Sequence, residues 1–173
     1  CPMALLSHGP GASASINTSD YALRDPSSCS ISESRKVLMP PFQGGVEYEM
    51  KLQNLECDRG SFDVVWATHA LYAIPQNELE EALGCMINTI GNIEASGVVG
   101  SGFIAHAKSR SHYLEFYQLF LKAFKQVGVE PFTSAEQITS VLTRMGLPLE
   151  VKEIAYTNGV PEDMEMEVEQ YLQ

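Results

Sequence analysis

The sequence lacks the features that mark a membrane protein or a nucleic-acid-binding protein. No apolar run approaches the roughly 18 residues that a membrane-spanning helix needs. Lys and Arg number 11 against 22 Asp and Glu, so the formal net charge is −11, and the basic residues form no run or stripe. A broad basic surface for a phosphate backbone is therefore not expected. We expect neither a membrane nor a nucleic acid as a partner.

Cysteine is scarce, and its spacing fits no metal site. The four cysteines, Cys1, Cys29, Cys57 and Cys85, stand far apart, and no pair has the short spacing of metal ligands. Residues 1–16 also lack the basic start and the long apolar stretch of a secretory signal. We therefore expect reduced thiols in a cytoplasmic protein, and no bound metal.

Apolar residues are plentiful enough for one core. The chain has 173 residues, of which 45% are hydrophobic, and this length suits one domain of ordinary size. No linker divides the chain, so a single domain over residues 1–173 is predicted. Residues 1–30 are rich in Ser, Gly and Pro and carry little interpretable pattern beyond the apolar run 3–6.

Residues 62–107 carry the strongest secondary-structure pattern. The run 62–67 (FDVVWA) is short, apolar and contains β-branched residues, which is typical of a strand buried on both faces of a parallel sheet. Apolar residues then recur at helical spacing over 79–90, and the small apolar run 98–107 predicts a second strand. Strand, helix and strand in this order form a right-handed parallel crossover. The sequence therefore predicts an α/β fold with a mostly parallel sheet flanked by helices.

The remaining elements follow from weaker patterns. Thr133 and Glu136 have the spacing of a capping box, which predicts a helix from there to Gly146. The other expected elements are a helix over 30–39, a turn at Gly44-Gly45, strands over 46–52 and 149–156, and helices over 113–124 and 161–172.

Histidines and tyrosines follow the two predicted strands. In open parallel sheets, ligands bind outside the carboxyl ends of the strands. This rule selects His69 and Tyr72 after the first strand and His106 after the second. With His112, three of the four histidines fall at one predicted rim. A lone histidine is more often a surface or core residue, but the shared position favours a site.

The segment 62–75 (FDVVWATHALYAIP) resembles motif IV of class I S-adenosylmethionine-dependent methyltransferases. The chain from 62 to 157 is similar to small-molecule methyltransferases of the histamine N-methyltransferase type. Those proteins share a Leu-Tyr pair, an aromatic helix after the fifth strand and a Thr-Ser start to a later helix. The resemblance implies a Rossmann-like sheet, S-adenosylmethionine as the cofactor, and in-line transfer of a methyl group to a small-molecule acceptor.

The first half of the chain resembles this family less closely. Gly9-Pro10-Gly11 is similar to the family's glycine-rich loop, and Asp25 in the segment RDPS is similar to the acid that holds the ribose. Only 13 residues separate Gly11 from Asp25, whereas a helix and a strand need about 11 and about 5 residues. The first half is therefore expected to be shortened or incomplete, and a plain turn at 9–11 stays an open alternative. The resemblance implies that the cofactor-binding residues are Gly9, Gly11, Asp25, Thr68 and His69.

The resemblance also implies roles at the predicted rim. His69 is the first choice for a catalytic residue, and the expected substrate-binding residues are Tyr72, His106, Tyr113 and Tyr117. Two functions stay open: methyl transfer to a small molecule, and a non-catalytic methyltransferase-like interaction module without a working cofactor loop. A nucleotide-dependent oxidoreductase is disfavoured, because no full GxGxxG precedes an acid about 20 residues further on. Neither the methyl acceptor nor the oligomeric state follows from the sequence.

Overall fold

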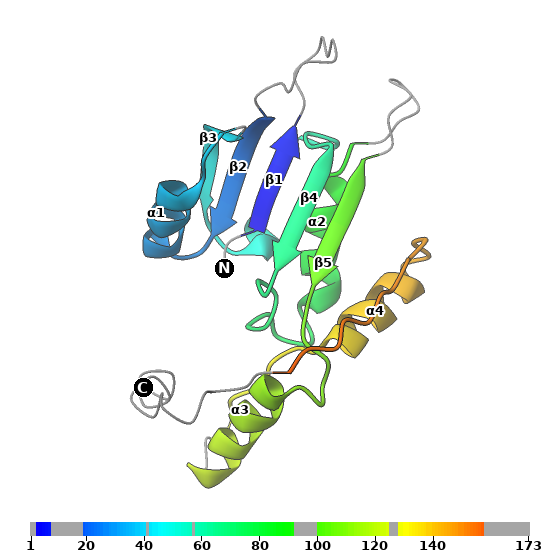
Figure 1. Ribbon diagram of the computed structural model, residues 1–173. Helices are drawn as coiled ribbons and strands as arrows, with labels where there is room; N and C mark the ends of the chain where they lie inside the picture. Colours follow the sequence, from blue (N-terminus) through cyan, green and yellow to red (C-terminus); the bar gives the residue numbers. More distant parts are fainter. Residues whose placement is uncertain are drawn as a thin grey trace.

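One five-stranded sheet with helices on both faces makes up the fold (Figure 1). The computed structural model describes residues 3–7, 19–40, 42–56, 58–91, 100–124 and 128–157. The strands are β1 (Met3–Ser7), β2 (Ser19–Asp25), β3 (Phe42–Glu49), β4 (Val64–Thr68) and β5 (Ser101–Ala105). The helices are α1 (Ser28–Val37), α2 (Leu79–Asn88), α3 (His112–Ala123) and α4 (Ala135–Arg144), with the short 3-10 helix η1 (Leu52–Asn54). The α/β class is therefore confirmed. Within these ranges, no helix has the length and apolar character needed to cross a membrane.

The central strand β1 runs against its neighbours. The sheet order is β3-β2-β1-β4-β5, and β1 pairs antiparallel with both β2 and β4. The pairs β2–β3 and β4–β5 are parallel, so these four strands share one direction. In Figure 1 the arrow of β1 points up, whereas the arrows of β2, β4 and β5 point down. The sheet is therefore mixed: the expected parallel pairing is found for β2–β3 and β4–β5, and it is wrong for both pairings of β1.

The short connection after β1 accounts for its direction. Parallel neighbours need a crossover of a dozen or more residues, usually with a helix, whereas antiparallel neighbours accept a shorter link. Eleven residues, 8–18, join Ser7 at the end of β1 to Ser19 at the start of β2. The connection is therefore too short for a parallel crossover, and β1 adopts the antiparallel pairing.

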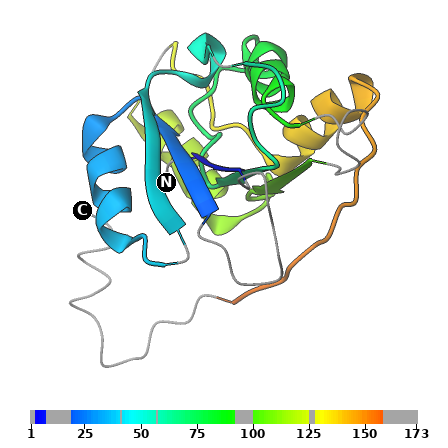
Figure 2. The ribbon, with the colours of Figure 1, turned by 90° about the horizontal axis from the view of Figure 1, so that it is seen from above.

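Each face of the sheet carries its own hydrophobic core. In β2, Ala22 faces one core while Tyr21 and Leu23 face the other, as the period of two along a strand requires. Ile31 of α1 packs with Tyr21 and Leu23, whereas α2 and α4 cover the opposite face. Figure 2 shows α1 on one side of the sheet and these two helices on the other. The larger core includes Leu52, Val65, Ala67, Leu79, Leu83, Met86, Ile138 and Leu142.

Gly44-Gly45 lies inside β3, so the turn predicted there is wrong. A Cβ atom at position 45 would lie 1.9 Å from the carbonyl oxygen of Tyr21. The register between β2 and β3 shifts between Tyr21 and Leu23. A glycine lets the two backbones approach at such an irregularity, so it marks a bulge rather than a chain reversal.

Helix α4 begins at a capping box one residue after the predicted one. The side chain of Ser134 accepts the backbone N–H of Gln137, and the side chain of Gln137 accepts the N–H of Ser134. The two residues of the predicted capping box form other hydrogen bonds. The Thr133 hydroxyl donates to the carbonyl of Ile74, and the Glu136 carboxylate accepts the N–H of Ser109. The helix itself was predicted correctly, whereas its capping residues were not.

Four further predictions differ in outcome. The helices expected over 30–39 and 113–124 correspond to α1 and α3. The strand expected over 149–156 is wrong, because this segment is in no strand of the sheet. The helix expected over 161–172 lies outside the described residues.

One face of β4 and β5 is open to solvent. Trp66 is 47% exposed and Phe103 is 49% exposed, and their rings stack with centroids 5.4 Å apart. The opposite face of β4 is fully buried through Val65 and Ala67. The prediction that this strand is buried on both faces is therefore wrong, and β4 has the one-sided burial that is common in antiparallel sheets.

Arg24 carries a buried guanidinium group in β2. The residue is 7% exposed, and its Nε atom has no hydrogen-bond partner among the described residues. Burial lowers the pKa of Arg24, and the neighbouring Asp25 carboxylate partly offsets this effect. A buried N–H group that lacks a hydrogen-bond partner destabilises a fold.

The substitution Arg24→Met removes this cost and keeps an unbranched apolar side chain at the position. We expect the free energy of unfolding, measured by urea denaturation, to rise by about 1–3 kcal/mol. Arg59→Met in an exposed turn is the matched control, and it should change the value by less than about 0.5 kcal/mol. A clear loss of stability in Arg24→Met would contradict the assignment of an unsatisfied Nε–H group.

Candidate functional site

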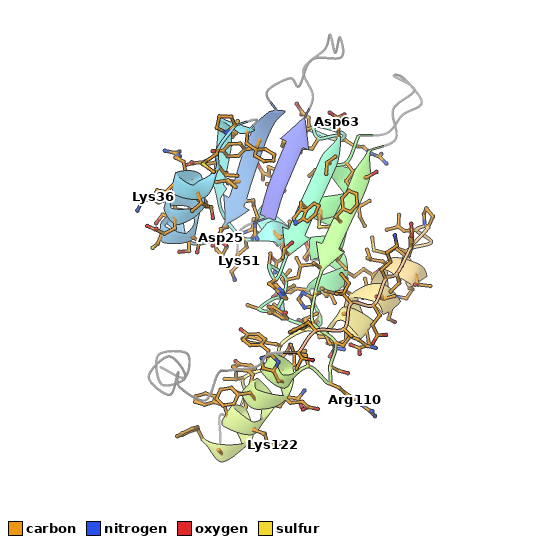
Figure 3. The ribbon with its side chains drawn as sticks, in the orientation of Figure 1. Asp25, Lys36, Lys51, Asp63, Arg110 and Lys122 are labelled. Carbon is orange, nitrogen blue, oxygen red and sulfur yellow. The ribbon has the colours of Figure 1, made fainter. Side chains whose placement is uncertain are left out.

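The carboxyl ends of four strands meet at one edge of the sheet. The last residues of β2, β3, β4 and β5 are Asp25, Glu49, Thr68 and Ala105. In Figure 3 the labelled Asp25 lies at this edge, whereas Asp63, just before β4, lies at the opposite edge. Thr68, His69 and His106 therefore share the edge of Asp25, because they stand at or just after the ends of β4 and β5.

Six rings gather beyond the ends of β4 and β5, and we call this cluster the aromatic site. Tyr72 lies at its centre, with its ring centroid 4.0 Å from that of His106 and 5.3 Å from that of Tyr113. Phe132 stacks on Tyr117 with centroids 3.7 Å apart. The structure thus brings His69 together with all four residues expected to bind substrate, while their roles stay predictions. The members are His69, Tyr72, His106, Tyr113, Tyr117 and Phe132.

Phe132 is the member that sequence reasoning missed. Its ring contacts those of Tyr72, Tyr113 and Tyr117, which all come from earlier parts of the chain. A local pattern could not identify it, because all three partners are distant from it in the sequence. Its place directly before the Thr133-Ser134 helix start was the one available signal.

His69 turns the chain after β4. Its N–H donates to the carbonyl of Ala105 at 3.0 Å, which extends the pairing of β4 with β5. Its φ is 51°, in the left-handed region that residues other than glycine rarely adopt. Its Nδ1 atom lies 2.5 Å from the hydroxyl oxygen of Tyr72, which also accepts the N–H of Ala107 at 3.3 Å. His69 and Tyr72 thus form a polar end of the aromatic site.

His106 is held in its neutral form. Its Nε2 atom lies 2.8 Å from the carbonyl oxygen of Thr133. Because a carbonyl only accepts hydrogen bonds, Nε2 carries the proton and Nδ1 is left as an acceptor. Within the described ranges, this buried Nδ1 has no hydrogen-bond partner. Burial lowers the pKa of His106, the hydrogen bond to Thr133 opposes this, and His69 lowers the pKa further.

The start of α4 holds the loops that carry the site. The N–H of Thr133 donates to the Tyr72 carbonyl at 3.0 Å, and its hydroxyl donates to the Ile74 carbonyl at 2.9 Å. The carboxylate of Glu136 accepts the N–H of Ser109 at 2.9 Å. Burial acts to raise the pKa of Glu136, but hydrogen bonds from its own backbone and from Ser109 lower it overall. The loops after β4 and β5 are therefore both fixed to one helix.

Two of the residues expected to bind a cofactor, Asp25 and Thr68, lie at the same edge of the sheet as the aromatic site. Asp25 precedes α1, where its Oδ1 atom accepts the N–H of Ser27 at 2.8 Å. The hydroxyl of Thr68 accepts a hydrogen bond from the indole N–H of Trp66. Both side chains therefore already have partners within the chain.

The two glycines expected to bind the cofactor, Gly9 and Gly11, lie outside the described residues. The strand before them, β1, ends at Ser7, which pairs with Asp20 near the start of β2. The chain therefore enters and leaves the segment 8–18 at the edge opposite Asp25. Of the residues expected to bind S-adenosylmethionine, Asp25, Thr68 and His69 are described, and they stand at or just after the carboxyl ends of β2 and β4.

Similarity to known proteins does not decide the family. No model of a protein family matches the chain, and no curated protein matches it. The resemblance of residues 62–157 to small-molecule methyltransferases therefore stays a hypothesis. In the part of the chain that the structure describes, no group of three or more His, Cys, Asp or Glu side chains could hold a metal ion.

The half-buried His106 makes the stability of the fold depend on pH. The unfolded chain binds a proton at the ordinary histidine pKa of about 6.5, whereas burial lowers the pKa of His106 in the folded chain. The contribution of the neutral His106 ring to the free energy of unfolding is therefore fully present above pH ~6.5, and it is lost as the pH falls toward the pKa of His106 in the folded chain.

We expect the free energy of unfolding, measured by urea denaturation, to decrease from about pH 7.5 to about pH 5.5. His106→Gln should flatten this dependence, because glutamine does not titrate. His112→Gln, at an exposed position, is the matched control and should keep the wild-type slope. An equal slope in His106→Gln and the wild type would contradict the assignment.

Proposed function

We propose that this chain is a methyltransferase-type domain that binds a small-molecule methyl acceptor at the aromatic site. The observation that carries the proposal is the meeting of Tyr72 with His69, His106 and Tyr113 beyond the ends of two adjacent parallel strands. Aromatic rings bind flat or cationic molecules by stacking and by cation–π contact. The polar end formed by His69 and Tyr72 would fix the orientation of the bound molecule.

The strand order supports a Rossmann-like plan for the sheet. The order β3-β2-β1-β4-β5 is the one found in doubly wound α/β sheets, where ligands bind beyond the carboxyl ends near the point at which the order reverses. In this chain the order reverses between β1 and β4, and His69 directly follows β4. The direction of β1 is the departure from that plan.

The reaction we propose is methyl transfer to the bound acceptor. The aromatic rings would align the acceptor, and alignment removes entropy from the barrier of a displacement reaction. A protein base is required only where the acceptor must lose a proton, and His69 beside Tyr72 is the candidate for that task. S-adenosylmethionine would supply the methyl group, and Asp25, Thr68 and His69 are the described residues proposed to hold it.

A non-catalytic methyltransferase-like module is the second candidate. The direction of β1 favours it, since the glycine segment leaves from the edge opposite the aromatic site. Such a module would keep the aromatic site and lack a working cofactor loop. The two candidates therefore agree on small-molecule binding and differ on the cofactor.

Binding of S-adenosylhomocysteine separates the two candidates. Methyl transfer predicts that millimolar S-adenosylhomocysteine stabilises the protein, by about 2.7 kcal/mol at a hundredfold excess over Kd, measured as a rise in Tm. Asp25→Asn should weaken this effect, and Asp58→Asn at an exposed loop position should leave it unchanged. The non-catalytic module predicts no effect of this ligand.

A panel of small aromatic amines and phenols tests the part that both candidates share. These compounds should raise Tm in the wild type, and Tyr113→Ala should reduce the rise because it removes a ring from the aromatic site. Phe124→Ala, in the exposed residue that ends α3, is the matched control. If neither the panel nor S-adenosylhomocysteine changes Tm at millimolar concentration, the proposed function is wrong.

A further inference from the structure

The hydroxyl group of Tyr72 stands between one donor and one ring nitrogen. Ala107 contributes a backbone N–H at 3.3 Å, and an N–H can only donate, so the phenol oxygen accepts this bond. His69 contributes Nδ1 at 2.5 Å. The phenol has a single hydrogen, and Nδ1 is the acceptor within its reach. Donation from Tyr72 to Nδ1 therefore satisfies all three groups, and it places the proton of the neutral His69 ring on Nε2.

We propose that Tyr72 and His69 form a proton relay for a small molecule bound at the aromatic site, an inference that rests on the proposed function. The acidic hydrogen of the bound molecule, on an ammonium nitrogen or a phenolic oxygen, passes to the oxygen of Tyr72. The original hydroxyl proton of Tyr72 passes at the same time to Nδ1 of His69. The products are the deprotonated molecule, a neutral Tyr72 and a His69 imidazolium, so protons and charge balance. Tyr72 is the residue that contacts the molecule, and His69 acts through it.

The surroundings of Tyr72 suit a hydroxyl group that passes a proton on, rather than one that takes up a proton by itself. Burial raises the pKa of Tyr72, the hydrogen bond from Ala107 opposes this, and Tyr113 and Tyr156 raise the pKa further. The phenol therefore stays protonated at neutral pH and cannot take up a proton unless it gives one away. The imidazole nitrogen Nδ1 of His69, within hydrogen-bond distance, can accept the proton that Tyr72 gives away.

Titratable groups from several elements surround the relay. His106 follows β5 and its ring packs on Tyr72, and Tyr113 of α3 lies on another side of the same ring. Tyr156, after α4, acts on Tyr72 electrostatically. His69 in turn influences His106. The titratable groups that adjoin the relay are therefore one histidine and two tyrosines.

The backbone of His69 suggests a matched variant. A φ of 51° is costly for most residues, by about 1–2 kcal/mol, but asparagine adopts this region more readily. In His69→Asn the side-chain oxygen lies close to the former position of Nδ1 and still accepts a hydrogen bond from Tyr72. It cannot accept a proton. This variant thus separates a structural hydrogen bond from proton transfer.

The tautomer of His69 is the first test, and it requires no ligand. NMR of the protein with ¹⁵N-labelled histidine rings, at about pH 8 where imidazole is neutral, should show His69 with a protonated Nε2 and an unprotonated Nδ1. Tyr72→Phe should remove this preference, whereas Tyr113→Phe, which keeps the hydrogen bond, should retain it. A protonated Nδ1 in the wild type would overturn the relay, whatever the protein binds.

Deprotonation of a bound probe is the second test. The probe is 4-nitrophenol, whose anion is recognised by its visible absorption. In the wild type we expect the apparent pKa of the bound probe to fall by about one unit or more relative to His69→Asn, a roughly tenfold larger anion fraction at a pH below that pKa. Equal apparent pKa values in these two proteins, with the probe bound to both, would overturn the relay. Absence of probe binding would count against the proposed small-molecule site, and the tautomer measurement would then decide the relay alone.

Discussion

The length of one connection governs how this sheet is organised. Eleven residues between β1 and β2 are too few for a parallel crossover, so β1 enters the sheet antiparallel to both neighbours. The other four strands keep a common direction, and their carboxyl ends form a single edge. As a result, the aromatic site stands at the edge opposite the one where β1 ends.

The aromatic site depends on interactions that are independent of β1. The loops after β4 and β5 are tied to the start of α4 through Thr133 and Glu136, and the rings of Tyr72, Tyr113 and Phe132 pack on one another. These contacts all lie within residues 62–157, the part of the chain that resembles small-molecule methyltransferases. The aromatic site can therefore form whatever the direction of β1.

The sequence predicted the features that local patterns determine. The strand, helix and strand of residues 62–107 follow from apolar periodicity, and the shared edge of His69 and His106 follows from their places after adjacent parallel strands. The direction of β1 is not a local property, because it depends on the length of the connection and on pairing with β4. Gly45 was misread as a turn, since the close approach of Tyr21 involves a distant strand. The ring contacts of Phe132 are equally long-range.

The direction of β1 is the claim on which the account depends most directly. Backbone NOEs measured by NMR between β1 and β2 decide it, because facing residues in a sheet differ between the two directions. The antiparallel arrangement predicts contacts from Met3 to Arg24 and from Ser7 to Asp20. Contacts from Met3 to Asp20, with Ser7 near Arg24, would show a parallel β1 and contradict the account.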